Sequence, residues 1–192
     1  RSFKISKQAV KVAFDRVKAN KGTYGIDEQT IAGFEKNLKD NLYKIWNRMS
    51  SGTYFPKPVK AVAIPKKNGG TRILGIPIVE DRVAQMVAKM YFESNVEKLF
   101  DQDSYGYRPN KSAIQAVGVL RERCWQKDWI VDFDIKGLFD NIRHDYLIEM
   151  VKRHTNAPWI ILYIERWLKT SFKMQDGQVV NRTAGTPQGR SN

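Results

Sequence analysis

Apolar residues recur along this chain at spacings that predict where its helices lie. Val10, Phe14 and Val17 fall on one face of a helix, and Ser6, just before them, is suited to be its N-cap. Apolar side chains recur at the same spacing through residues 31–49 and predict one long amphipathic helix. Further helices are predicted over residues 79 to about 93, 144 to about 154, and 158 to about 169.

Two stretches of β-branched and apolar residues surround a turn signal and predict β-hairpins. The first, VKAVAIPKKNGGTRILGIP, turns at Asn68-Gly69, a pair that tight hairpin turns favour. The second surrounds Asp176-Gly177. Between them, Ser112 and Gln115 form a capping box that predicts the start of another helix. Hairpins mixed with helices, without regular alternation, predict an α+β fold.

The stretch IVDFDIKGLFDN predicts a buried strand centred on Phe133. Side chains alternate along a strand, so Val131, Phe133 and Ile135 would share one face, and Asp132 and Asp134 the other. Because ionised carboxylates are costly to desolvate, the acidic face must meet solvent, cations or basic side chains. A Mg²⁺ site would relieve the repulsion between the two carboxylates. On the strand pattern alone, a solvated sheet edge is the stronger alternative.

Composition narrows the class of protein and of partner. The chain has 33 Lys and Arg against 20 Asp and Glu, a formal charge of +13, which favours a polyanionic partner such as nucleic acid. Cys124 is the single cysteine, so an intrachain disulfide is excluded and an intracellular protein is expected. The apolar runs are far shorter than a membrane span, and no membrane partner is expected.

Basic residues gather near the turn of the first hairpin. Lys66 and Arg72 lie on either side of the glycine-containing turn, and Lys67 is beside them. Arg can bind phosphate oxygens through two hydrogen bonds at once. Combined with strand carboxylates that bind metal ions, such cations would suit nucleotidyl transfer. Taken alone, a hairpin with two or three lysines is usually just an ordinary solvated hairpin.

Five blocks make the pattern specific when they are taken in order: NKGTYGID, PKKNGGTRILGIP, SYGYRPNKSA, VDFDIKGLFDNIRH and GTPQG. They resemble consecutive blocks of the reverse transcriptases encoded by bacterial group II introns. The resemblance extends from about Asn20 to Gly189. Retron and diversity-generating reverse transcriptases are relatives, and the segments GTYGID and GYRPNKSA favour the intron group.

The resemblance implies a right-hand polymerase. Residues 1–120 would form the fingers, including an N-terminal template-binding extension, and residues 121–192 a partial palm. Asp134 would be the first catalytic aspartate and a ligand of Mg²⁺, with the backbone carbonyl of Ile135 as a second ligand. Phe139 would lie under the sugar of the incoming nucleotide and exclude a 2′-hydroxyl.

Other positions match the family at its nucleotide and nucleic-acid sites. Lys66 and Arg72 would meet the triphosphate, and Gln188 would lie close to the nucleotide and template. The resemblance also suggests contacts to nucleic acid from a further set of residues: Lys21, Gly22, Gly25, Lys67 and Arg108. For Arg108, an internal salt bridge is an equally good alternative.

The implied activity is RNA-directed DNA synthesis by a parent protein that also assists intron splicing and mobility. Its partners would be an RNA template, the intron RNA, a DNA primer and dNTPs, in the bacterial cytoplasm or an organelle. The family's adjacent Asp-Asp pair is absent from these residues, and both ends carry an Arg-Ser pair. We therefore expect an excised fragment that binds RNA without synthesising DNA.

Two other classes of function compete with this interpretation. One is a non-catalytic RNA-binding module, which would share the salt-dependent binding to RNA. The other is an acid/base hydrolase that uses Asp132 and Asp134. The hydrolase is the poorer alternative, because it gives no reason for the basic hairpin or for the PQG block.

Overall fold

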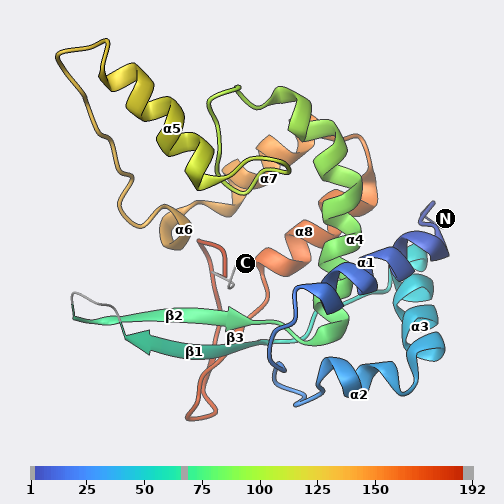
Figure 1. Ribbon diagram of the computed structural model, residues 1–192. Coiled ribbons are helices and arrows are strands. Elements are labelled where there is room, and N and C mark those ends of the chain that lie inside the picture. The colour runs from blue at the N-terminus through green and yellow to red at the C-terminus, as the bar shows by residue number, and fades with distance from the viewer. Residues whose placement is uncertain (1–2, 66–68, 188–192) are drawn as a thin grey trace. The chain divides into compact units, whose positions relative to one another are not determined.

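A computed structural model describes residues 3–65 and 69–187 of the chain. Helices and short strands are mixed, which confirms the predicted α+β class (Figure 1). The order of the elements is α1 Lys7–Ala19, α2 Ile31–Glu35, α3 Leu38–Ser51, β1 Val59–Pro65, β2 Thr71–Ile76, α4 Val79–Val96, the 3₁₀ turn Glu97–Leu99, α5 Ala113–Cys124, α6 Leu138–Asn141, α7 His144–His154, α8 Pro158–Leu168, β3 Phe172–Lys173 and β4 Val179–Val180.

The chain divides into two compact units. The first unit contains Arg1–Phe92 and Gly137–Asn192, and the second contains Glu93–Lys136. The proposed boundary between fingers and palm near residue 120 does not coincide with this division and stays a prediction. Among the described residues, no helix combines the length and the apolar character that crossing a membrane requires.

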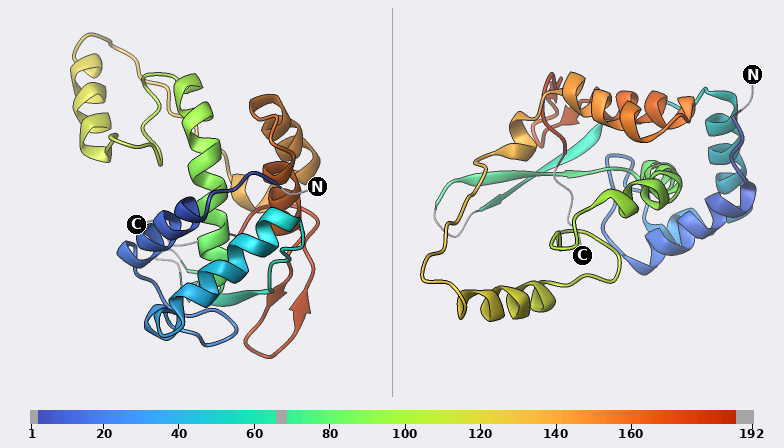
Figure 2. Two further views of the ribbon diagram at one scale, coloured as in Figure 1. Left: turned by 90° about the vertical axis from the view of Figure 1, so that its right-hand side faces the viewer. Right: turned by 90° about the horizontal axis from the view of Figure 1, so that it is seen from above.

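The core of the first unit is built around α4. Figure 2 shows α4 passing between α1 and α3 on one side and α7 and α8 on the other. Val83 and Val87 of α4 are fully buried. Phe14 of α1 stacks on Phe34 of α2 with ring centroids 5.5 Å apart. Removing such side chains from water is the main favourable contribution to folding this unit.

The predicted helix over residues 31–49 is in fact two helices, and this part of the prediction was wrong. α2 ends at Glu35 and α3 begins at Leu38, after Asn37 leaves helical backbone geometry. The side-chain amide of Asn41 donates a hydrogen bond to the carbonyl of Phe34 at 2.9 Å. This bond satisfies a carbonyl that would accept a backbone amide if the helix were continuous. The apolar residues keep their helical spacing on both sides of the break, which is why the sequence pattern does not show it.

Both predicted hairpins are present and join one four-stranded sheet. The strand order is β2-β1-β3-β4, in which β1 pairs antiparallel with β2 and parallel with β3. The parallel pairing of Val59 with Phe172 links the two hairpins and was not predicted from the sequence. The β1–β2 hairpin extends away from α1, α3 and α4 (Figures 1 and 2).

The second unit has little buried apolar surface of its own. Its α5 begins at the predicted capping box, in which Ser112 and Gln115 exchange hydrogen bonds. All of α5 lies within the described residues, and none of its side chains is buried. A bidentate ion pair, Arg123 with Asp103 at 2.7 and 2.9 Å, joins α5 to the loop that precedes it.

Candidate active site

The segment that carries Asp134 differs from its prediction. Residues 130–135, all of them described, form no strand and are exposed. Phe133, expected to be buried, is 89% exposed. A strand needs hydrogen-bonding neighbours, and the described sheet supplies none to this segment. Asp132, Asp134 and Ile135 are therefore all exposed residues rather than members of a buried strand.

Phe139 lies on α6 in the first unit, next to the segment that leads into the PQG block. The amide of Thr186 donates to the carbonyl of Phe139 at 2.7 Å, and the amide of Gly185 donates to that of Ile142 at 2.8 Å. Gly185 has a φ of +73°, and a Cβ there would lie 2.5 Å from the carbonyl oxygen of Asp140. Only glycine permits this close approach. The side chain of Phe139 itself is half-exposed.

His144, the first residue of α7, completes this contact. Its Nε2 lies 2.8 Å from the carbonyl oxygen of Gly185, and since a carbonyl only accepts, the imidazole donates. Three hydrogen bonds thus fix residues 185–186 to α6, to the residue that follows it and to the start of α7. Gln188, the predicted nucleotide contact, follows two residues later and lies outside the described residues.

The base of the β1–β2 hairpin meets the same segment. Gly75 of β2 is packed so closely that a Cβ there would lie 2.8 Å from the Cβ of Pro187. Arg72 lies further along β2, exposed and paired in register with Ile64. Lys66, predicted to meet the triphosphate, and Lys67, a predicted nucleic-acid contact, lie outside the described residues. The hairpin, the Phe139 segment and residues 185–187 are therefore neighbours in the first unit.

The glycine-rich loop after α1 packs on the start of α4. Lys21 and Gly22 both have positive φ, 55° and 111°. Arg82 donates to the carbonyl of Thr23 at 2.8 Å and to that of Lys21 at 3.4 Å. Gly25 is buried so tightly that a Cβ would lie 2.7 Å from the amide nitrogen of Ile78. These glycines thus have a packing role, whatever contact they make to nucleic acid.

Arg108 is occupied by contacts inside the second unit. Its guanidinium pairs with Glu97 at 2.8 Å and donates to the carbonyls of Asp101 and Ser104 at 2.6 and 2.9 Å. Its side chain is 10% exposed. Of the two alternatives that the sequence left open, the geometry favours the internal salt bridge over a contact to template phosphate.

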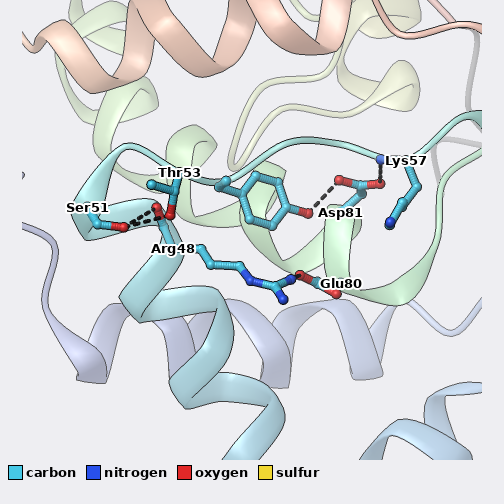
Figure 3. Close-up of polar contacts among 7 residues, drawn as sticks. Arg48, Ser51, Thr53, Lys57, Glu80 and Asp81 are labelled. Carbon is cyan, nitrogen blue, oxygen red and sulfur yellow. Dashed lines mark hydrogen bonds and ion pairs between the residues drawn. The ribbon is translucent and has the colours of Figure 1, made fainter.

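A buried carboxyl group at the start of α4 was missed by the sequence analysis. Asp81 is 1% exposed and accepts hydrogen bonds from the hydroxyl of Tyr54 and from the amide of Lys57 at 3.0 Å (Figure 3). Burial raises its pKa to about 6, although both hydrogen bonds act in the opposite direction. Burial likewise raises the pKa of Tyr54, so its hydroxyl stays protonated and donates. Asp81 thereby fixes the segment that leads into β1.

The described residues do not complete a metal site by themselves. Within residues 3–65 and 69–187, no group of three or more His, Cys, Asp and Glu side chains lies close enough to hold an ion. Asp134 with the carbonyl of Ile135 could supply some of the oxygen ligands that Mg²⁺ prefers. The others would have to come from elsewhere.

Comparison with known proteins decides the family. Residues 64–192 match the family described as "Reverse transcriptase (RNA-dependent DNA polymerase)". The chain belongs to the reverse transcriptase family. The matched region contains β2, the Asp134 segment, α6 and the GTPQG block.

Individual relatives of this reverse transcriptase chain confirm the resemblance seen in the five blocks. It is 34% identical over 181 residues to "Group II intron-encoded protein LtrA" of Lactococcus lactis subsp. cremoris, covering 93% of this chain and 30% of that protein. It is 29% identical over 180 residues to "Putative COX1/OXI3 intron 1 protein" of Saccharomyces cerevisiae, covering 93% of this chain and 21% of that protein. The chain thus spans less than a third of the length of these relatives.

A solved structure shows the same fold. A chain of the "Cas6-RT-Cas1--Cas2 complex" superposes with a TM-score of 0.59 at 20% identity, over 96% of this chain and 19% of that one. This reverse transcriptase chain therefore shares its fold with a protein of low sequence similarity.

Proposed function

We propose that these residues are the fingers and part of the palm of a group II intron reverse transcriptase, whose complete form synthesises DNA on RNA and acts in splicing and mobility of its intron. The meeting of three blocks in the first unit carries this proposal. Gly75, at the base of the hairpin, packs against Pro187. The amide of Thr186 donates a hydrogen bond to the carbonyl of Phe139. A polymerase needs these elements together, because catalysis of phosphoryl transfer rests on positioning and on electrostatic stabilisation.

Each predicted residue has a role in this proposal. Asp134 and the carbonyl of Ile135 contribute to binding Mg²⁺, which would neutralise charge on the triphosphate when bound. Arg72 and Lys66 bind the triphosphate, and Phe139 contacts the sugar. Gln188 lies near the template. The GTYGID loop and the +13 charge of the chain favour binding of the RNA template and primer.

The proposal is tested with the complete gene product that contains these residues. Primer extension is measured on an RNA template with a DNA primer, dNTPs and Mg²⁺. Asp134→Asn should lower the rate by on the order of 10³-fold or more, since a metal ligand supplies several kcal/mol to the transition state. Asp132→Asn is the matched control, because it removes a neighbouring exposed carboxylate. RNA affinity should be nearly unchanged in both variants.

Two results would contradict the proposal. Synthesis by Asp134→Asn at the rate of the unaltered protein would remove Asp134 from the site. A complete gene product that binds RNA but extends no primer under any divalent cation would favour the non-catalytic module instead.

A further inference from the structure

An exposed aromatic ring is held rigidly on the surface of the first unit. Phe55, in the loop between α3 and β1, is 66% exposed. The guanidinium of Arg166 lies 3.9 Å from the centre of its ring. Arg166 is itself fixed, because one of its nitrogens donates to the carbonyls of both Gly52 and Tyr54. One face of the Phe55 ring is thus covered by Arg166, while 66% of the residue stays exposed.

A polar hollow of about 320 Å³ adjoins this ring. Its lining includes Phe55 itself together with Arg48, Thr53, Lys57 and Glu80. Arg48 and Glu80 form an ion pair at 3.3 Å. Figure 3 shows the side chains of Arg48, Lys57 and Glu80 on the same side of the loop that carries Thr53. The hollow therefore offers cationic donors and a carboxylate acceptor beside an aromatic face.

The buried Asp81 holds the loop that carries Phe55. Its carboxylate accepts hydrogen bonds from the hydroxyl of Tyr54 and from the amide of Lys57. These two residues flank Phe55 and Pro56 in the loop. The loop is consequently anchored at both ends of the exposed ring. An anchored ring loses little conformational entropy when a ligand stacks on it, which favours binding.

The chemistry of this surface fits one unpaired nucleotide. Nucleic-acid bases stack on aromatic side chains in single-stranded complexes, and cations beside the ring neutralise the adjoining phosphates. A carboxylate such as that of Glu80 can accept a hydrogen bond from an exocyclic amino group of a base. Glu80 balances the charge of Arg48, so Lys57 supplies the net positive charge for a phosphate.

We propose that Phe55 and the adjoining hollow bind one unpaired nucleotide of RNA, with its base on the open face of Phe55 and its phosphate at Lys57. This inference rests on the proposed function in taking RNA as the partner. It adds a contact surface that contains none of the residues predicted for the polymerase site.

The test measures binding of a fluorescent single-stranded RNA to the 192-residue chain over a range of salt concentrations. Phe55→Ala should lose roughly 5- to 100-fold in affinity, the range expected for one stacked base. Phe55→Trp should retain the affinity, whereas Phe55→Leu should lose it while still covering Arg166. Tyr43→Ala is the matched control, since Tyr43 is another exposed ring with a cation, Lys7, beside it.

The phosphate contact has a separate readout. Lys57→Ala should reduce the slope of log affinity against log salt by about 0.7, the value for one phosphate of a single strand. Lys39→Ala on α3 removes another exposed positive charge and should leave the slope unchanged. RNA carrying 5-iodouridine, irradiated in complex with the chain, should give a crosslink that peptide mass spectrometry places at Phe55.

Failure of this inference is distinguishable from failure of the proposed function. If the chain binds RNA but Phe55→Ala and Phe55→Leu bind equally well and no crosslink reaches Phe55, the nucleotide site is wrong and the proposed function stands. If the unaltered chain shows no salt-dependent affinity for RNA, the nucleotide site is equally overturned and the proposed function loses its support.

Discussion

The imidazole of His144 donates a hydrogen bond to the carbonyl of Gly185, and this contact spans 41 positions of the sequence. It joins the first residue of α7 to the segment that leads into the PQG block. The amides of Gly185 and Thr186 bond to the carbonyls of Ile142 and Phe139 in the same place. Residues 185 and 186 are therefore held by hydrogen bonds to α6, to Ile142 and to the start of α7.

Gly185→Ala should destabilise the chain by about 2–5 kcal/mol. An alanine at φ +73° is strained by its conformation, and its Cβ would collide with two backbone carbonyls, those of Phe139 and Asp140. Urea unfolding monitored by circular dichroism measures the loss. Gly177→Ala is the matched control, because Gly177 has a φ of +84° but nothing within 4 Å of its Cβ position. Equal losses in the two variants would show that the tight contact at Gly185 adds nothing.

Asp81 should make stability fall as pH rises through about 6. Because its folded pKa, about 6, lies above the ordinary value of 3.8, the folded chain holds a proton between these values that the unfolded chain releases. The resulting stabilisation is complete below about pH 4 and is lost above pH 6, a difference of roughly 3 kcal/mol. Asp81→Asn keeps the shape but cannot ionise, so the difference in unfolding free energy between this variant and the original chain should vary across pH 4–7.

Tyr54→Phe tests the same group from the other side. It removes a hydrogen bond that lowers the pKa of Asp81, so the pH-dependent window should extend to higher pH. It also leaves one carboxyl oxygen without its donor, which should cost about 1–3 kcal/mol near pH 7. Denaturant unfolding at successive pH values measures both effects. If the curves of unfolding free energy against pH are parallel for Tyr54→Phe and the original chain, the hydroxyl does not influence the ionisation of Asp81.

Gly25→Ala should destabilise the first unit through a backbone collision. Its Cβ would lie within 2.8 Å of the amide nitrogen and Cα of Ile78, neither of which can move without displacing the start of α4. We expect a loss of about 1–3 kcal/mol. Gly118→Ala, in the middle of α5 with open space around its Cβ position, should instead stabilise by up to about 1 kcal/mol. Thermal unfolding compares the two, and a neutral Gly25→Ala would show that the loop is not seated against Ile78.

Local signals made much of the fold predictable. Ser6 and Ser112 cap their helices as their sequence contexts indicated, and Asp176-Gly177 turns the second hairpin. Each of these features depends on residues close together in the sequence, so a pattern of a few positions is enough. The strand predicted at Phe133 failed for the opposite reason. Alternation fixes which side chains share a face, but a strand also needs a partner, and no local pattern shows whether one is present.

The buried carboxyl group of Asp81 illustrates an intermediate case. Asp81, Ala84 and Ala88 are spaced three and four positions apart, so they lie on one face of α4, and all three are buried. An aspartate on an otherwise apolar helix face was a visible signal of a buried polar contact. Its donors, Tyr54 and Lys57, come from another element, and only the structure identifies them.

Arg108→Ala should loosen the second unit. It should leave RNA affinity and its salt dependence unchanged, which a residue in contact with a phosphate would not do. The guanidinium holds Glu97 and two loop carbonyls together, and its loss should cost roughly 1–3 kcal/mol of local stability. Hydrogen exchange should therefore accelerate over residues 97–112, while exchange in the first unit stays the same. Lys127→Ala removes one exposed charge from the same unit and serves as the control for RNA affinity. If Arg108→Ala lowers the salt slope of RNA binding by about 0.7 and Lys127→Ala does not, Arg108 contacts a phosphate after all.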